Sequence, residues 1–183
     1  GQAVPFRITD LLKLDTCWRA SERLQQVRDL AFLHVAYATL LRVSEVSRLR
    51  VRDITRAADG RIVLDVGWTK TIVMTGGLIK ALGELSSERL TAWLTRSGLI
   101  HEPDAYIFGP VHRTNRAVPA TNKPLSTRAL EDIFVRAWQE AGPGKDALTN
   151  KKRYRGWSGH STRVGAAIDM AAQKYSTAQI MQE

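Results

Sequence analysis

The chain has 183 residues, with 27 lysines and arginines against 18 aspartates and glutamates, so its formal net charge is +9. This length suits one domain whose core needs neither disulfide nor metal, and so large a positive charge favours a polyanionic partner, nucleic acid before a membrane surface. No apolar run approaches the ~20 residues that span a bilayer, and no signal peptide opens the chain, so we expect no membrane association.

The cysteine and histidine content argues against a disulfide or a metal site. Cys17 is the only cysteine, and we expect a small buried or half-buried thiol in a reducing compartment. The histidines have no cysteine partners and no pair at the spacing of metal ligands, so we expect no metal. They are His34, His101, His112 and His160.

The first third of the chain predicts helices. Residues 8–10 have the pattern of a helix start before Leu11, Leu12 and Leu14. Ser21 is predicted to open a longer helix that runs to about Leu41 and is apolar around most of its circumference, as in the central helix of a small α-rich domain. A break near Arg42 should follow, and then a short helix directs three side chains inward. These are Val43, Val46 and Leu49.

Beyond Asp59 the pattern changes to the alternation of strands. Residues 62–66 and 71–74 predict a β-hairpin whose connection, residues 67–70, places Lys70 at or beside its tip. A third short strand is expected at residues 78–81. The three strands would make a small antiparallel sheet at one edge of a mainly helical α+β domain.

Helices return in the second half of the chain. One is predicted at residues 86–97 with Gly98 as its stop, and Ser126 is expected to cap another. Residues 103–121 are predicted to be a loop with a short extended piece, and residues 141–156 a mobile loop. Ser176 with Gln179 has the pattern of a capping box for a last helix. The core face of the helix after Ser126 is Leu130, Ile133, Phe134, Ala137 and Trp138.

The segment Trp157–Arg163 carries the strongest functional signal. His160 and Arg163 lie three residues apart at the predicted start of a helix, on one shared face. A helix N-terminus favours anions, so a cation and a proton-transferring ring there predict a phosphate site. The motif alone equally fits an ordinary helix start with a satisfied histidine and a solvated arginine.

Three ordered segments resemble the catalytic motifs of the tyrosine site-specific recombinases, most closely those of the Cre-like branch. The segments are 40–46, 68–71 and 159–165, and the likeness extends from about Arg28 to Glu183. The resemblance implies the catalytic-domain fold of that family, which breaks and rejoins DNA through a 3′-phosphotyrosine without ATP, metal or other cofactor. It also implies a tetramer on DNA for the full-length protein, a monomer for this fragment, and a nucleoid-associated, cytoplasmic place in a bacterial, phage or plasmid context.

The resemblance assigns a role to each catalytic residue. Arg42 and Arg163 would clamp the non-bridging oxygens of the scissile phosphate, a task that suits two planar, permanently charged guanidiniums. His160 would hydrogen-bond the same phosphate, and Lys70 would protonate the departing 5′ oxygen. Glu45 would orient its neighbours and balance local charge.

The resemblance also suggests residues that contact DNA away from the scissile phosphate. Arg128 would read a guanine in the major groove, with a phosphate contact as the rival interpretation. The remaining residues are expected at the DNA backbone, where contacts position a protein without reading sequence. They are Arg113, Arg116, Lys151, Lys152, Arg153, Tyr154 and Arg155.

The sequence departs from the family after Arg163. The nucleophilic tyrosine and its supporting Trp or His belong beyond the final helix pair, and Tyr175 is too close to Arg163 for that role, so we expect it to pack. Residues 1–183 would then be one catalytic domain without the family's N-terminal clamping domain or its nucleophile, able to bind DNA but not to cut it. A non-catalytic DNA-binding module and a type IB topoisomerase are the alternative functions.

Overall fold

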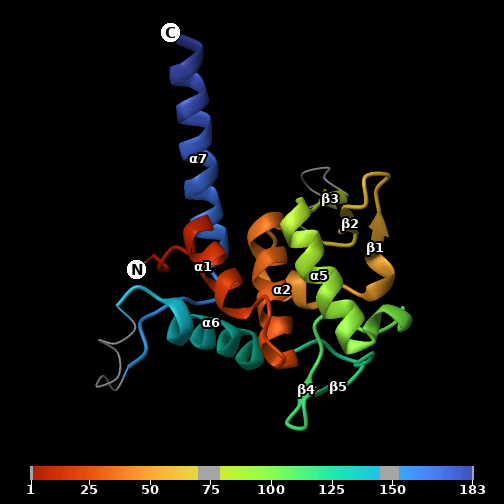
Figure 1. Ribbon diagram of the computed structural model, residues 1–183. Coiled ribbons are helices and arrows are strands. Elements are labelled where there is room, and N and C mark those ends of the chain that lie inside the picture. Colours follow the sequence, from red (N-terminus) through yellow and green to blue (C-terminus); the bar gives the residue numbers. More distant parts are fainter. Residues whose placement is uncertain (1, 70–78, 145–152, 183) are drawn as a thin grey trace.

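The computed structural model describes residues 2–69, 79–144 and 153–182, with the backbone alone at 175–182 (Figure 1). The helices are α1 (Ile8–Trp18), α2 (Leu24–Thr39), α3 (Val43–Ser47), α5 (Glu84–Ser97), α6 (Thr127–Ala141) and α7 (Ser161–Gln182), with 3₁₀ turns at Val51–Asp53 and Leu99–His101. The strands are β1 (Ile54–Arg56), β2 (Ile62–Asp65), β3 (Ile79–Ala81), β4 (Val111–His112) and β5 (Arg116–Ala117).

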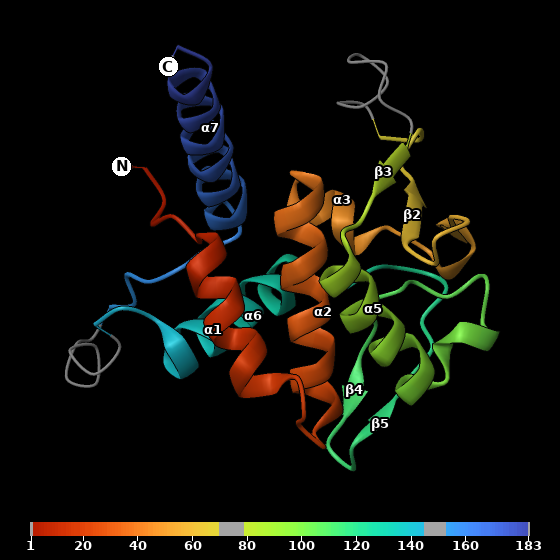
Figure 2. The ribbon, with the colours of Figure 1, turned by 45° about the horizontal axis from the view of Figure 1, so that its top comes forward.

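Helix α2 forms the centre of the domain, as its nearly continuous apolar surface predicts. It packs against α1, α5 and α7, and Figure 2 shows it between α1 on one side and α5 with the sheet on the other. The helix begins at Leu24 and not at Ser21, whose hydroxyl accepts from the backbone N–H of Arg23 and donates to Gln26. Among the described residues, the largest fully buried side chains include Trp93, Trp157, Phe6, Phe32, Phe108 and Phe134.

A buried charge network joins α6 to α2. The carboxylate of Asp29 is fully buried and accepts from Arg28 at 3.1 and 3.2 Å and from Nε of Arg136 at 2.8 Å. Arg28 also donates to the carbonyl of Gly109. Because each buried charge has an oppositely charged partner, the network orients α6 without leaving an uncompensated ion.

The structure confirms a small sheet of three antiparallel strands, but these are not the three strands that the sequence predicts. Strand β2 is central, with Ile54 of β1 opposite Leu64 on one side and β3 paired with it on the other. The sequence pattern missed β1, because three residues are too few for an alternation to stand out. The predicted strand at residues 71–74 lies outside the described residues, as does Lys70.

Part of the predicted loop at residues 103–121 is a second hairpin, formed by β4 and β5. Its turn contains Asn115 at φ 64°, a left-handed conformation that asparagine tolerates well. The Asn115 side chain accepts from the backbone N–H of Leu24 and donates to the carbonyl of Glu22. The hairpin therefore caps the N-terminal end of α2.

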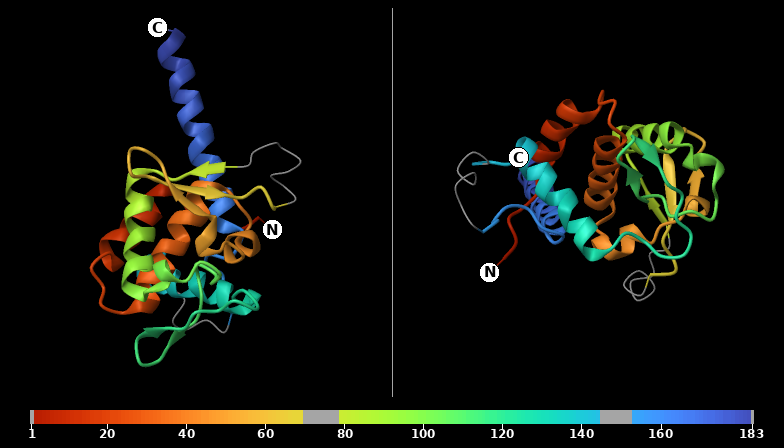
Figure 3. Two further views of the ribbon diagram at one scale, coloured as in Figure 1. Left: turned by 90° about the vertical axis from the view of Figure 1, so that its right-hand side faces the viewer. Right: turned by 90° about the horizontal axis from the view of Figure 1, so that it is seen from below.

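Helix α7 is packed at its start and then extends away from the domain (Figures 1 and 3). Asp169 anchors it by accepting from Arg7 at 2.6 Å, from the backbone of Ile8 at 2.8 Å and from the Tyr37 hydroxyl at 2.6 Å. The prediction of a new helix at Ser176 is wrong, because α7 runs through it without a break. The sequence from 166 to 182 holds no glycine or proline to end the helix.

The start of the chain also differs from expectation. Helix α1 begins at Ile8, and Asp10 is its third residue, where the carboxylate accepts from the backbone N–H of Arg7. Cys17 is exposed, because α1 turns Leu14 and Trp18 toward the core instead. Within the part of the chain that the structure describes, no helix is long and apolar enough to cross a membrane.

Candidate functional site

Arg42 is placed by an abrupt turn at the end of α2. Leu40 has φ 60°, a left-handed conformation that costs a residue with a side chain about 1–2 kcal/mol. The chain reverses there, and Arg42 becomes the residue before α3. Its backbone N–H donates to the Glu45 carboxylate at 3.0 Å. Glu45 thus holds the backbone of Arg42 at the start of α3.

His160 and Arg163 are placed by the buried segment that precedes α7. Trp157 is fully buried, and its indole N–H donates to the carbonyl of Pro5 at 3.1 Å. The backbone N–H of Ser158 then donates to the hydroxyl of Ser161 at 2.9 Å, which closes the first turn. His160 is exposed and Arg163 half-buried at the start of α7. They line a groove of about 680 Å³ with Leu40, Val164, Ala167 and Ile168.

Gly159 joins the Arg42 and His160 segments. A Cβ atom at Gly159 would lie 3.0 Å from a methyl of Val43 and 2.6 Å from a carboxylate oxygen of Glu131, so the backbone passes directly between α3 and α6. Its N–H donates to both carboxylate oxygens of Glu131, at 3.1 and 3.0 Å. Residues far apart in the sequence are therefore held together immediately beside His160. No periodicity or motif in the sequence indicates this contact.

The side chains of Arg42, His160 and Arg163 have no hydrogen bond or ion pair with any other described residue. The buried Arg28 and the half-buried Arg136 behave differently, since both pair with Asp29. Two guanidiniums and an imidazole near a helix N-terminus, without partners of their own, suit the oxygens of a phosphate. Across the described ranges, no group of three or more His, Cys, Asp or Glu side chains could hold a metal ion.

Arg128 is well placed to reach a ligand outside the domain. It is exposed in the first turn of α6, directly after the capping residue Ser126, whose hydroxyl accepts from the backbone N–H of Ala129 at 3.1 Å. Glu131, one turn further along, holds Gly159. A single helix start thus carries both the predicted base reader and the anchor of the His160 segment.

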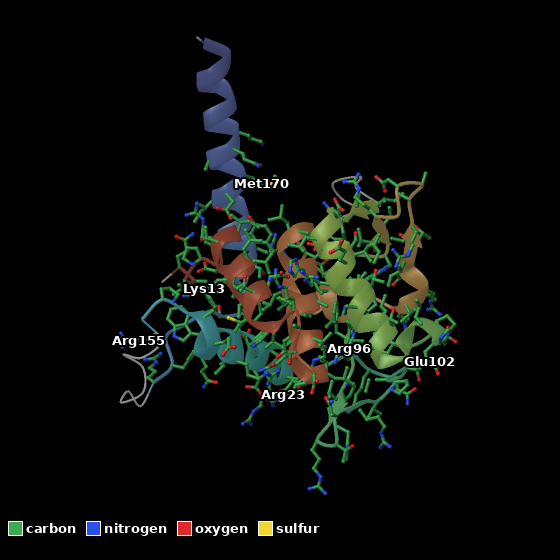
Figure 4. All side chains as sticks on the ribbon, in the orientation of Figure 1. Lys13, Arg23, Arg96, Glu102, Arg155 and Met170 are labelled. Atoms are coloured by element: carbon green, nitrogen blue, oxygen red, sulfur yellow. The ribbon has the colours of Figure 1, made fainter. Side chains whose placement is uncertain are left out.

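The other predicted DNA contacts fall into two groups. Arg153, Tyr154 and Arg155 are exposed just before the Trp157 segment, although the Tyr154 hydroxyl is turned inward, where it is partly buried and donates to the Trp157 carbonyl at 2.8 Å. Lys151 and Lys152 lie outside the described residues. Figure 4 shows Arg155 near the C-terminal end of α6.

Arg113 and Arg116 are not brought to the site. They are exposed on the β4–β5 hairpin, which caps the N-terminal end of α2, whereas Arg42 follows its C-terminal end. A helix of 16 residues is about 24 Å long. Arg113 and Arg116 are therefore distant from Arg42.

The hydroxyls of the described tyrosines are engaged elsewhere. Tyr37 donates to Asp169, and burial with the neighbouring carboxylate raises its pKa far above the usual value. Burial, with Glu131 nearby, likewise raises the pKa of Tyr154. The Tyr106 hydroxyl accepts from Arg50 at 3.0 Å. None of the three is poised as a nucleophile, and the Tyr175 side chain lies outside the described residues.

A sequence profile of the phage integrase family matches residues 10–183. The chain belongs to the phage integrase family. It is 42% identical over 181 residues to the recombinase Cre of Escherichia phage P1, a match that covers 99% of this chain and 52% of that protein. The chain thus spans about half the length of this relative. The predicted kinship with Cre-like tyrosine recombinases is confirmed.

Solved structures confirm the fold. The XerH site-specific recombinase bound to difH substrate, in a pre-cleavage complex, matches with a TM-score of 0.57 at 18% identity, over 94% of this chain and 44% of that chain. Its post-cleavage complex with palindromic difH matches with a TM-score of 0.58 at 17% identity, over 96% and 44%. The mainly helical fold with a small sheet is thus that of a tyrosine recombinase. The roles assigned to individual site residues stay predictions.

Proposed function

We propose that residues 1–183 form the DNA-binding, phosphate-activating part of the catalytic domain of a site-specific DNA recombinase. The observation that carries the proposal is that Arg42, His160 and Arg163 lack partners among the described residues and are linked through Gly159. The partner is duplex DNA, in a cytoplasmic, nucleoid-associated setting. The tetrameric assembly on DNA belongs to a full-length protein, and these residues alone are monomeric.

The chemistry follows from the charges that strand cleavage creates. As a nucleophile attacks the phosphorus, negative charge grows on the non-bridging oxygens, and donors already fixed there stabilise the transition state without reorganising. Arg42 and Arg163 supply those donors, His160 hydrogen-bonds the same phosphate, and Lys70 gives a proton to the departing 5′ oxygen. The covalent phosphotyrosine conserves the bond energy, so that rejoining needs no ATP.

The nucleophilic tyrosine is proposed to come from outside residues 1–183. The hydroxyls of Tyr37, Tyr106 and Tyr154 already have internal partners. The 183-residue chain should therefore bind DNA without forming a covalent adduct. A chimera that joins it to the following segment of the phage P1 relative should supply the missing group.

A denaturing gel for protein-linked DNA tests the proposal on nicked duplexes that carry the relative's target site. The chimera should give a 3′-phosphotyrosyl band and the 183-residue chain none. Arg42→Ala and Arg163→Ala in the chimera should each lower the cleavage rate by the ~10²–10³-fold typical of a lost oxyanion donor. Arg23→Ala removes the same charge from the far end of α2 (Figure 4) and should change nothing.

Three results would contradict this account. Cleavage that survives both arginine substitutions would contradict the phosphate clamp, and a folded chimera that binds DNA but gives no band would favour a non-catalytic DNA-binding module. A band from the 183-residue chain itself, lost on Tyr175→Phe, would make Tyr175 the nucleophile.

A further inference from the structure

A second cationic cleft lies at the other end of α3 from Arg42. Its volume is about 340 Å³, and it is lined by Arg48, Arg50, Arg52, Asp53, Trp68 and Tyr106. Arg42 precedes α3 and Arg48 follows it, and a helix of five residues is about 7.5 Å long. A single DNA strand whose phosphate occupies the Arg42 site can therefore continue into this cleft.

The inner wall of the cleft is rigid. The Arg50 guanidinium lies over the Tyr106 ring, 4.2 Å from its centroid, and also donates to the Tyr106 hydroxyl at 3.0 Å and to the Asp104 carbonyl at 2.6 Å. One carboxylate oxygen of Asp53 accepts from the backbone N–H of Arg50 at 2.8 Å at the base of this wall. The wall supplies positive charge in a fixed position.

The outer part of the cleft has two cations that a ligand can engage. The exposed Arg48 side chain has no partner among residues 2–69, 79–144 and 153–182. Arg52 pairs with Asp104 at 3.0 Å, but both side chains are more than half exposed, and an exposed pair of this kind is worth little. A phosphate can therefore replace Asp104 at Arg52 at small cost.

Trp68 gives the cleft an aromatic surface. It is 42% exposed, whereas the other four tryptophans of the chain are at most 7% exposed. The turn beneath it is ordered, because the Thr69 hydroxyl donates to the Val66 carbonyl at 3.0 Å and the backbone N–H of Gly67 donates to Asp65 at 3.0 Å. The indole thus projects from an ordered turn and lines a cleft with three arginines, an arrangement that suits stacking on nucleic-acid bases.

We propose that this cleft binds an unpaired nucleotide of the DNA strand, with its phosphate on Arg48 and Arg52 and its base stacked on Trp68. Bases inside an intact duplex are stacked on one another and cannot lie on a protein ring, so the cleft selects DNA that has been opened beside the scissile phosphate. Such opening accompanies strand exchange. The inference rests on the proposed function and adds a preferred state of the substrate.

The 183-residue chain itself is sufficient for the test, because its other four tryptophans are buried and a bound base can quench by contact only the emission of the exposed Trp68. Two labelled DNAs of the same sequence are compared, an intact duplex and a duplex with a short single-stranded gap. Anisotropy measures binding, and tryptophan emission measures contact with Trp68. The gapped DNA should bind about fivefold more tightly or better, as one stacked base allows, and should alone quench the emission.

Variants separate stacking from general electrostatics. Trp68→Ala should bring the affinity ratio of gapped to intact DNA close to one, and Trp68→Phe should restore most of the preference. Arg48→Ala should weaken binding of the gapped DNA more than Arg23→Ala, which removes an exposed charge elsewhere. Circular dichroism of each variant verifies folding.

The possible failures are distinguishable. Rising anisotropy on both DNAs with unchanged tryptophan emission, or a preference that survives Trp68→Ala, overturns the second site and leaves the proposed function intact. Absence of binding to either DNA overturns the proposed function itself. Equal quenching by intact duplex would show that Trp68 contacts the ordinary backbone and would also reject selection for an unpaired base.

Discussion

The backbone N–H of Gly159 donates to both oxygens of the Glu131 carboxylate, at 3.1 and 3.0 Å, and this pair ties the segment before His160 to α6. The predicted base reader Arg128 lies one turn earlier on the same helix, so α6 carries both Arg128 and the anchor of the His160 segment. Glu131 is therefore a positioning residue that acts through Gly159.

Replacing Glu131 should loosen this anchor. In Glu131→Ala the buried N–H of Gly159 loses its acceptor, which typically costs about 1–3 kcal/mol of unfolding free energy. Glu131→Gln keeps one carbonyl oxygen and should lose less. Urea unfolding measures both, with the exposed Asp132→Ala on the same helix as control. Equal losses for the three variants would show that the contact does not matter.

Gly165 should tolerate no side chain. A Cβ atom there would collide with the backbone carbonyl of Phe6, which cannot move away like a flexible side chain. Glycine to alanine inside a helix normally stabilises by about 1 kcal/mol, so a loss would be diagnostic of the close approach. We expect Gly165→Ala to lower stability by about 1–3 kcal/mol in thermal unfolding. Lys174→Ala on the exposed part of α7 should be neutral, and a stabilised Gly165→Ala would contradict the packing.

The sequence predicts the elements that have long periodic patterns. The apolar surface of α2 and the core face of α6 both indicate helices, and the helix after His160 begins at the expected place. Shorter elements depend on partners distant in the sequence. Strand β1 has only three residues and exists because β2 pairs with it, and the β4–β5 hairpin is held by Asn115 against α2.

The candidate site shows the same division. His160 and Arg163 at a predicted helix start indicate a phosphate site from the sequence alone, and the resemblance to the recombinases adds Arg42 to it. The approach of the segment before His160 to the one that follows Arg42 does not follow from any pattern, because it depends on Leu40 in a left-handed conformation and on Glu131 and Gly159, which are 28 residues apart. The prediction of a helix start at Ser176 fails for the opposite reason, because a local capping pattern has no effect where the helix continues on both sides.

Arg128 and Arg153 should differ in what they recognise. Arg128→Ala should relax preference at one guanine by about 1–3 kcal/mol, because a guanidinium at an exposed helix start can pair with a base edge. Arg153→Ala should weaken all duplexes alike and reduce the slope of log affinity against log salt by about one. Competition with point-substituted duplexes at several salt concentrations distinguishes them. A uniform loss for Arg128→Ala would show that it contacts only phosphate.

A buried polar cluster away from the site should make stability depend on pH. Nε2 of His34 forms a hydrogen bond with Asp15 at 2.9 Å, and its Nδ1 forms one with the Ser86 hydroxyl at 3.0 Å. Arg89 also donates to Asp15, at 2.6 and 3.0 Å. Burial lowers the pKa of His34 and outweighs its hydrogen bond to Asp15. Burial alone would raise the pKa of Asp15, but the hydrogen bonds from Arg89 and His34 outweigh it and lower the pKa.

Both shifts predict loss of stability in acid. Below the ordinary histidine pKa of about 6.5, His34 binds a proton in the unfolded chain while the folded form stays neutral, so unfolding takes up a proton. As the pH is lowered, this residue should therefore decrease the free energy of unfolding by up to about 1.4 kcal/mol per pH unit. Protonation of Asp15 lowers the free energy of unfolding further, but only near and below the ordinary pKa of about 3.8.

His34→Asn isolates the histidine contribution. The variant should be less stable at pH 7.5, since the cluster loses hydrogen bonds, but its stability should fall less between pH 7.5 and 5.5 than that of the unmodified chain. Urea unfolding at both pH values measures the difference. His101→Asn, at an exposed position, should keep the full pH dependence. If His34→Asn keeps it as well, the acid sensitivity arises elsewhere, and the neutral buried His34 is not its source.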